Sequence, residues 1–386
     1  MSTDLLPDTA ASLALAVYTL NAGVQRDLKA FLARREFSQG SSQTTLQAKT
    51  GGRIFRASKD GFGLCATGAG QYKGDLFLIF RGTTTANNNA DMVTDARIGI
   101  ERSTSGLPVH IGFNHTFKSM LPEIRSFIAE SKITGTVHCI GHSLGGAVAT
   151  LAADWAASSL SLPVKLYTFG QPRVGLTFFS SMLTQKLGSK NIHRVFHTTD
   201  PVPMVPVFPY LHTPLPGYGH RKISENPIIS GEAHRMTAYT KGLGNSWESL
   251  VSAPPINNHE AAIEEWLRSN ANSNPMCPKT FEWLENAIIW LLKKQLSTLT
   301  VGLQWAAMGI HTFLDKVAWI LAKGIEIGEK CAEYVKLFIR KVMKILGLNY
   351  QEGVTSISHA FLRYLLQSLV KRANDLAINA IRGLAG

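Results

Sequence analysis

The stretch TVHCIGHSLGGAVAT, residues 136–150, decides the fold that we expect for this chain. Residues 136–140 are mostly β-branched or apolar and predict a buried strand. The next five residues, GHSLG at 141–145, fit the G-x-S-x-G pattern of a sharp strand-to-helix turn that presents a serine. Residues 146–155 are small and apolar, as expected of a helix packed under a sheet. A chance loop could also match five residues, but the strand and helix around this one favour the functional interpretation.

The chemistry of such a turn explains its residue types. A tight turn forces Ser143 into a strained backbone conformation, so that its hydroxyl stands clear of the sheet. Gly141 and Gly145 let neighbouring backbone pass without a Cβ clash. Because the helix begins at the serine, its unpaired N–H groups face any negative charge that develops there. The stretch therefore predicts a nucleophilic serine.

Strand and helix patterns alternate on both sides of this stretch. A continuous apolar strand pattern occupies residues 75–80, another buried strand is expected at 164–169, and a further strand at 192–197. A helix is expected from about 113 to 129 and another over 178–187. Alternation with connections of this length predicts a parallel sheet, and hence an α/β fold.

Composition and charge limit the classes of partner. The 386 residues are 45% hydrophobic and 17% charged, and the formal net charge is +12. A basic protein of this kind suits an acidic partner such as anionic lipid or nucleic acid. The lysine-aromatic arrays of single-strand binders are missing from the sequence, so we expect no nucleic-acid partner. The oligomeric state is not predicted.

The cysteines predict neither a metal site nor a disulfide framework. They are scattered along the chain, without a C-x-x-C pair or a matching histidine spacing: Cys65, Cys139, Cys277 and Cys331. We interpret them as buried thiols and expect no metal or cofactor.

The first twenty residues bear on localisation. They carry Asp4 and Asp8 but no Lys or Arg, unlike the basic start of a secretory signal. We therefore expect synthesis in the cytoplasm without a Sec signal, export by a non-Sec route and action at a membrane surface.

A polar linker at residues 269–275 predicts two domains, 1–270 and 271–386. The second shows helical apolar stripes and no strand pattern, so we expect an all-α, basic, amphipathic domain. From Met276 onward it has 14 Lys/Arg and 8 Asp/Glu, a net of 14 − 8 = +6. It could serve as a cap, a membrane-engaging domain or a partner-binding module. Residues 296–314 lack charged side chains and predict a buried helical hairpin rather than a membrane span.

A serine nucleophile needs a base, and the base needs an acid to orient it. In the hydrolase chain order of Ser, Asp and His, Asp200 follows a predicted strand and His234 lies in a later loop. Asp200 could instead begin a turn before Pro201, and His234 could cap a helix. Four other histidines compete as the base, of which His220 is the strongest rival and His142 has a structural role: His142, His197, His212 and His220.

The tetrahedral intermediate of such a reaction needs two N–H donors for its oxyanion. The N–H of Leu144, next after the nucleophile, is one expected donor. The turn at residues 81–85 is the natural source of the second, and Thr83 can add a hydroxyl.

The chain resembles the class 3 lipases, the fungal-lipase-like α/β-hydrolases. The matching segments are LFLIFRGTTT (76–85), VHIGF (109–113), IGHSLGGAVATLAA (140–153), YTFGQPRVG (167–175), TDPVPMVP (199–206) and AHRMTAY (233–239). The resemblance covers residues ~60–245 and leaves out the C-terminal ~110 residues.

The resemblance implies an α/β-hydrolase with a mostly parallel sheet and a Ser143–Asp200–His234 triad. It also implies an oxyanion hole made by Thr83 and Leu144. The H-x-x-x-x-Y pattern in 233–239 favours His234 over His220 as the base.

The family's lid would lie at roughly 84–98 in this chain. Its candidate apolar face is Met92, Val93 and Ile98, and Met92 stands where the family has a Trp.

We therefore expect a serine ester hydrolase that releases fatty acids from membrane phospholipids or glycerides, with A1-type phospholipid cleavage preferred. Its expected partner is lipid at a membrane or emulsion interface. A bacterial type VI secretion effector, with an immunity or secretion-machine protein as partner, is a further expectation. The alternatives are a soluble short-chain or feruloyl-type esterase and a catalytically silent lipid-binding protein on the same fold.

Overall fold

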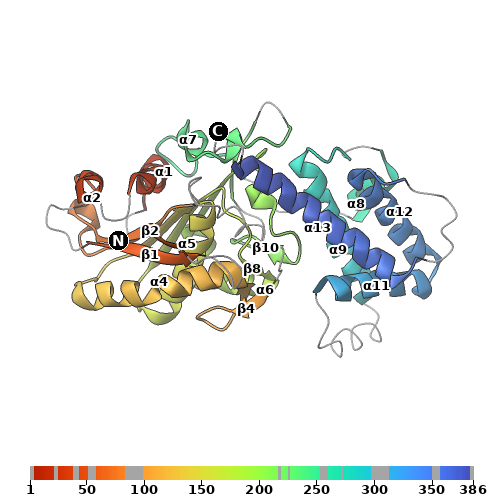
Figure 1. Cartoon of the computed structure of the whole chain (residues 1–386), viewed down its shortest axis with the longest axis horizontal. Helices are drawn as coiled ribbons and strands as arrows, with labels where there is room; N and C mark the ends of the chain where they lie inside the picture. The colour runs from red at the N-terminus through yellow and green to blue at the C-terminus, as the bar shows by residue number, and fades with distance from the viewer. Residues whose placement is uncertain are drawn as a thin grey trace.

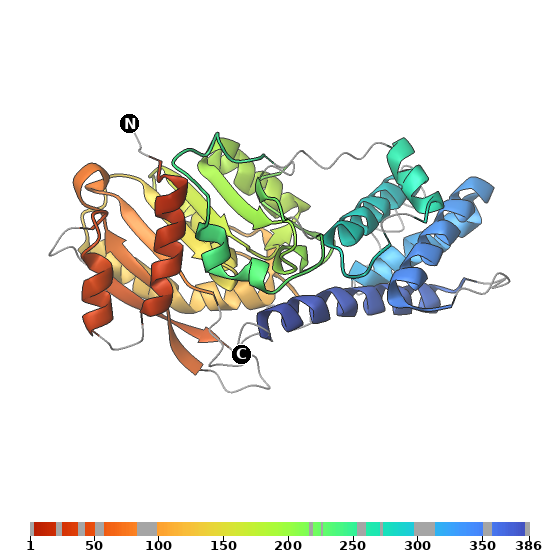
Figure 2. The ribbon, with the colours of Figure 1, turned by 90° about the horizontal axis from the view of Figure 1, so that it is seen from above.

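Figure 1 shows a computed structural model of the chain. The structure describes residues 4–20, 25–37, 43–50, 58–82, 99–215, 219–224, 227–252, 260–270, 273–296, 313–349 and 357–382. An α/β part contains both sheets, and a group of helices beside it contains the C-terminal third of the sequence (Figures 1 and 2).

The main sheet has seven strands in the order β1-β2-β3-β6-β7-β9-β11. The strands from β3 to β11 are parallel, whereas β1 and β2 join antiparallel at one edge. The bounds are β1 Gln43–Thr50, β2 Ser58–Thr67, β3 Leu76–Phe80, β6 Val137–His142, β7 Val164–Phe169, β9 Ile192–His197 and β11 His220–Lys222. The prediction of an α/β fold with a mostly parallel central sheet is confirmed.

Alternating side chains of the central strands form two cores, one on each face of the sheet. On β3, Leu76, Leu78 and Phe80 join the larger core, and Phe77 and Ile79 join the smaller one. Because both faces are covered, β3 is buried and apolar along its whole length, which is why the sequence showed it as a continuous run.

Helices cover both faces of the sheet (Figure 2). On the face of the larger core lie α4 (Ile111–Glu130), α5 (Leu144–Ser159) and α6 (Thr177–Leu187). On the other face lie α1 (Pro7–Ala16) and α7 (Met236–Thr240), which pack on each other. The remaining helix of this part is α2 (Gln25–Leu32), and a small second sheet has the order β10-β8-β5-β4 (Tyr210–Leu211, Gly175–Leu176, Pro108–His110, Ile100–Arg102).

The N-terminal helix differs from its prediction at both ends. The sequence predicts a helix from Thr9 to Asn21 with an Asp8 or Thr9 cap, but α1 begins at Pro7 and ends at Ala16. Proline suits the first turn of a helix because its missing N–H has no partner there. After Ala16 the chain tightens into the 3-10 turn η1 (Val17–Thr19).

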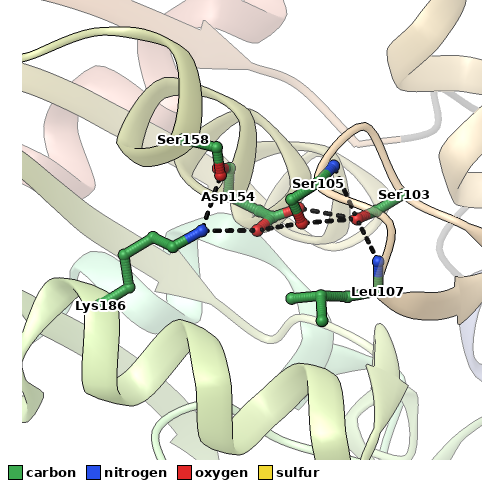
Figure 3. A network of polar contacts seen from close by, with 6 residues as sticks. All are labelled: Ser103, Ser105, Leu107, Asp154, Ser158 and Lys186. Carbon is green, nitrogen blue, oxygen red and sulfur yellow. Dashed lines mark hydrogen bonds and ion pairs between the residues drawn. The ribbon is translucent and has the colours of Figure 1, made fainter.

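A buried carboxylate fixes α5 to the loop after β4 (Figure 3). The hydroxyls of Ser103 and Ser105 donate to Asp154, whose side chain is fully buried, at 2.7–2.8 Å. Lys186 of α6 lies 4.0 Å away from the same carboxylate and donates to Ser158. Burial raises the pKa of Asp154, although the two serine hydroxyls act in the opposite direction. This network holds the helix that carries the serine turn at its start.

The C-terminal third is helical, as the sequence predicts. Its helices are α9 (Pro278–Leu296), α11 (Phe313–Ile327), α12 (Glu329–Leu346) and α13 (His359–Arg382). The helix α8 (Glu260–Arg268), which precedes the predicted linker, packs on α9 and α12. The division at residue 270 stays a prediction. Among the described helices, none has the length and apolar character that a membrane crossing requires; residues 297–312 of the predicted hairpin lie outside the described part.

The predicted linker is held by a buried lysine. Lys341 of α12 hydrogen-bonds to the carbonyl of Ser269 and, at 3.4 Å, to the hydroxyl of Ser273. Its ammonium group also lies 4.7 Å from the ring of Trp266, and burial lowers its pKa to about 8. The described residues at both ends of this segment therefore contact the helical region.

The helices join the α/β part through a shared core and a buried ion pair. Leu366, Leu369 and Val370 of α13 line an apolar cavity with Val207 and Phe208. Glu285 of α9 pairs with Arg173, and the same carboxylate oxygen accepts the N–H of Phe208 at 3.0 Å. α13 also packs against two short turns, η4 (Val202–Met204) and η5 (Glu232–His234).

We expect Glu285→Gln to lower the free energy of unfolding by about 3 kcal/mol, because it leaves the mostly buried charge of Arg173 without its partner. Urea unfolding followed by circular dichroism measures this change. The matched control is Glu333→Gln, which removes the ion pair of Glu333 with Arg268, where both side chains are about half exposed. We expect no measurable change for the control. Equal losses in the two variants would contradict a special role for the Glu285 pair.

Candidate active site

Ser143 stands at the junction of β6 and α5 in a strained backbone conformation. Its φ is 55° and its ψ is −129°, and among the described residues it is the only non-glycine with a positive φ. Such a conformation is costly for an L-residue and persists where the surrounding structure enforces it. The Ser143 N–H donates to the carbonyl of Phe169 on β7 at 3.0 Å, which ties the turn to the neighbouring strand.

Gly145 explains the second glycine of the pattern. A Cβ at this position would lie within about 2.6 Å of backbone atoms of Arg81, at the end of β3. No side chain fits there, so the first turn of α5 packs directly on the backbone that leaves β3. This close approach brings the serine next to the turn that follows β3.

The structure brings the three predicted catalytic side chains together. Nε2 of His234 lies 2.8 Å from the hydroxyl oxygen of Ser143. Nδ1 of His234 lies 2.8 Å from Oδ2 of Asp200. Asp200 is the third residue after the end of β9, and His234 is the last residue of the turn η5. All three side chains are buried: Ser143 is 4% exposed, His234 3% and Asp200 2%.

The partners of His234 fix its tautomer. A carboxylate accepts, so Nδ1 of His234 carries the proton and donates it to Asp200. Nε2 then has a free lone pair and accepts the hydroxyl proton of Ser143. This is the proton arrangement that a serine needs in order to act as a nucleophile.

Two further groups hold Asp200. The hydroxyl of Tyr239 donates to Oδ2 at 2.7 Å, and the N–H of Val202 donates to Oδ1 at 2.9 Å. Tyr239 also accepts the N–H of His197 at 3.0 Å. Burial, followed by the nearby Asp200, raises the pKa of Tyr239 well above its usual value, so this hydroxyl stays protonated and can donate.

The rival histidines do not reach the serine in the described structure. His220 lies on β11, where its ring contacts the rings of His193 and Trp247, and burial lowers its pKa to about 4. Nε2 of His212 is hydrogen-bonded to the carbonyl of Pro203 at 2.8 Å, and Nδ1 of His197 lies 3.4 Å from the hydroxyl of Thr199. The two ring nitrogens of His142 contact the hydroxyl of Tyr18 and the carbonyl of His234.

The expected oxyanion donors are partly described. Leu144 is the first residue of α5, a position whose N–H has no acceptor within the helix. Thr83 and the candidate lid residues Met92, Val93 and Ile98 lie outside the described residues. The described residues that lead to Thr83 are Arg81 and Gly82, both buried.

Sequence reasoning missed two tyrosines. The role of Tyr239 was visible only as the last letter of a family pattern. The hydroxyl of Tyr18, in η1, accepts the N–H of Gly82, 64 residues later, at 2.8 Å. It also lies 2.6 Å from Nδ1 of His142, 124 residues later. No local pattern predicts contacts of such separation.

The described residues contain no group of three or more His, Cys, Asp or Glu side chains that could hold a metal ion.

Comparison with known proteins agrees with this geometry. Residues 77–210 match the family model described as lipase (class 3). A secreted mono- and diacylglycerol lipase 1 of Fusarium solani is 34% identical over 160 residues, which are 38% of this chain and 46% of that protein.

The chain is therefore similar to the class 3 lipases over residues 77–210.

One further relative and one solved structure give the extent of the likeness. Secreted mono- and diacylglycerol lipase A of Penicillium camembertii is 28% identical over 211 residues, covering 53% of this chain and 66% of that protein. A crystal structure of a lipase from Rhizopus microsporus var. chinensis has a TM-score of 0.37 at 24% identity and covers 55% of this chain and 72% of that one. The chain thus spans less than two thirds of the curated relatives, from about half upward.

We expect Tyr239→Phe to lower the free energy of unfolding by about 2 kcal/mol, because it removes a hydrogen bond to a buried charged group. Tyr210→Phe is the matched control: this tyrosine is equally buried, but its hydroxyl donates to the neutral carbonyl of Gly99 at 3.2 Å. Its expected loss is about 1 kcal/mol. Urea unfolding curves compare the two, and a larger loss in the control would contradict our account of Asp200.

Proposed function

We propose that this chain is a serine ester hydrolase that releases fatty acids from lipids. The observation that carries the proposal is the hydrogen-bonded array of Ser143, His234 and Asp200, with the serine on a strained strand-to-helix turn. The family match and the names of the relatives support a carboxylic ester as the substrate.

The reaction follows from the proton positions. The hydroxyl oxygen of Ser143 attacks the acyl carbon while Nε2 of His234 takes the hydroxyl proton. Asp200 holds the resulting imidazolium through Nδ1. When the tetrahedral intermediate collapses, His234 gives the proton to the departing alcohol oxygen, leaving an acyl-serine. Water, deprotonated by His234, then attacks the acyl-serine, and the fatty acid leaves as Ser143 regains its proton.

The oxyanion of each intermediate needs preorganised donors. We assign one to the N–H of Leu144, at the positive end of α5. We assign the second to Thr83, whose preceding residues Arg81 and Gly82 are held against the start of α5. No metal or cofactor enters this scheme.

Two lipid classes are candidate substrates, and each has its own support. The relatives of Fusarium and Penicillium are named as mono- and diacylglycerol lipases, which favours acylglycerols. The helical third favours phospholipids in an anionic bilayer, cleaved in the A1 manner. On α12, Lys336, Arg340 and Lys344 are exposed at intervals of four residues and therefore share one face. A basic helix face of this kind is attracted to anionic lipid.

We expect Ser143→Ala to lose at least about a thousandfold of the fatty-acid release from every lipid substrate, because it removes the nucleophile. Release is measured from vesicles of phosphatidylglycerol and phosphatidylethanolamine and from a diacylglycerol emulsion. Higher turnover on vesicles supports the phospholipid proposal, and higher turnover on the emulsion supports acylglycerols. Hydrolysis of soluble short esters alone would favour a short-chain esterase. No ester hydrolysis at all would favour a lipid-binding protein on the same fold.

The role of the basic face is tested with the same vesicles. A variant with Lys336→Glu, Arg340→Glu and Lys344→Glu should lose binding to anionic vesicles but keep its activity on p-nitrophenyl butyrate. The matched control carries Lys73→Glu, Lys132→Glu and Lys190→Glu, with the same change in net charge. These three exposed lysines precede β3, β6 and β9. They therefore lie at the amino ends of the parallel strands, whereas the site lies at the carboxyl ends. Equal loss in both variants would mean that net charge, rather than α12, attracts the membrane.

An antibacterial effector role depends on this membrane activity. We propose export by a non-Sec route such as type VI secretion and an immunity protein as partner. The relatives are named as secreted, which supports action outside the producing cytoplasm.

We expect the chain to be toxic when it is directed to the periplasm of a bacterial host, and harmless in the cytoplasm. Toxicity should disappear in the Ser143→Ala variant, because lipid hydrolysis is its cause. Growth curves with inducible expression measure this difference. Equal growth in all strains would contradict the effector role.

A further inference from the structure

A chain of hydrogen bonds connects the N-terminal turn η1 to both sides of the candidate site. The hydroxyl of Tyr18 lies 2.8 Å from the backbone nitrogen of Gly82 and 2.6 Å from Nδ1 of His142. On the other side of the same imidazole, Nε2 of His142 lies 2.8 Å from the backbone oxygen of His234. Tyr18 thus links the residue before Thr83 with the residue that acts as the base.

Each donor in this chain can be assigned. A carbonyl oxygen only accepts, so Nε2 of His142 carries the proton and donates to His234. Burial lowers the pKa of His142 well below its usual value, and the nearby His234 adds to the effect, so the imidazole is neutral and Nδ1 is an acceptor. Tyr18 therefore donates its hydroxyl proton to Nδ1, and its oxygen accepts the N–H of Gly82.

The contacts around Gly82 are close. A Cβ added there would lie 2.8 Å from the Cβ of Ser143 and would overlap the hydroxyl of Tyr18. The Gly82 backbone therefore lies against both the tyrosine hydroxyl and Ser143. Any movement of the turn after β3 changes its distance from Ser143.

We propose that Tyr18 is a positioning residue for ester hydrolysis: its hydroxyl holds the Gly82 backbone beside the nucleophile and, through His142, the backbone of the base His234. The inference rests on the proposed function of Ser143 and His234. It adds the N-terminal segment, more than 120 residues before the serine turn, to the groups that shape the site.

Removing the hydroxyl affects the transition state more than substrate binding. Without it, the Gly82 N–H loses its acceptor and His142 loses the donor that fixes its ring. The turn that leads to Thr83 and the backbone of His234 are then both less well placed when charge develops. Tyr18 is not expected to contact the acyl chain, so affinity for the substrate should change little.

The first experiment compares Tyr18→Phe with Tyr167→Phe on a soluble ester. Tyr167 is a matched control because its buried hydroxyl also accepts a backbone N–H of the N-terminal segment, that of Leu5 at 3.1 Å, without contact to the triad. We expect Tyr18→Phe to lower kcat about tenfold with KM within twofold of wild type. The Ki of a boronic acid, which forms a tetrahedral adduct with the serine, should rise by the same factor. Tyr167→Phe should change none of these.

A second measurement tests the chain of hydrogen bonds through His142 without measuring catalysis. In wild type, NMR spectra of ¹⁵N-labelled histidine should show His142 as the Nε2–H tautomer. The His142 signal is identified as the one that disappears in the His142→Gln variant. In Tyr18→Phe the Nδ1 shift of His142 should move. The Tyr18→Phe/His142→Gln double variant should be no less active than His142→Gln alone, because both changes break one chain.

The outcomes separate the two proposals. If Ser143→Ala keeps its activity, the proposed function is wrong. If Ser143→Ala is inactive while Tyr18→Phe matches wild type or Tyr167→Phe in kcat and boronic-acid Ki, the role of Tyr18 alone is wrong. An Nδ1–H tautomer of His142, or multiplicative losses in the double variant, would also overturn it.

Discussion

Ser143 has a backbone conformation that an L-amino acid avoids, with φ at 55°. The strain is local, but its maintenance involves the whole α/β part. β7 accepts the serine N–H through Phe169, the backbone after β3 packs on Gly145, and α5 is fixed further along by Asp154. Because so many contacts fix the two elements that meet at the serine, the turn cannot relax without disrupting the sheet. The geometry of the nucleophile is therefore a property of the fold.

The same principle applies to the acid and the base, since backbone groups hold much of the site. Asp200 accepts the N–H of Val202, and the carbonyl of His234 accepts from His142. Two tyrosine hydroxyls bind further backbone groups near the site. Tyr239 accepts the N–H of His197 on β9, and Tyr18 accepts the N–H of Gly82 after β3. Side-chain chemistry at the site thus depends on residues whose own side chains do not react.

The sequence was most informative where burial is complete. The bounds of β7 and β9 agree with the prediction. The run at residues 75–80 was recognised because β3 is covered on both faces and is apolar throughout. The start of α1 was predicted two residues late, because a proline in the first turn replaced the expected polar cap. Ser143, Asp200 and His234 were found from chain order and a turn pattern. Tyr18 was not found, because its partners are set by the packing of α1 across the sheet and leave no local trace.

The position of α13 has a consequence for the order in which the molecule is completed during synthesis. This helix is the last described element of the chain, yet it packs behind η4 and η5, the turns next to Asp200 and His234. A chain that grows from its N-terminus can form the sheet and the serine turn well before residues 359–382 leave the ribosome. The packing behind Asp200 and His234 waits for α13. The site therefore acquires its full support only after this helix has been made.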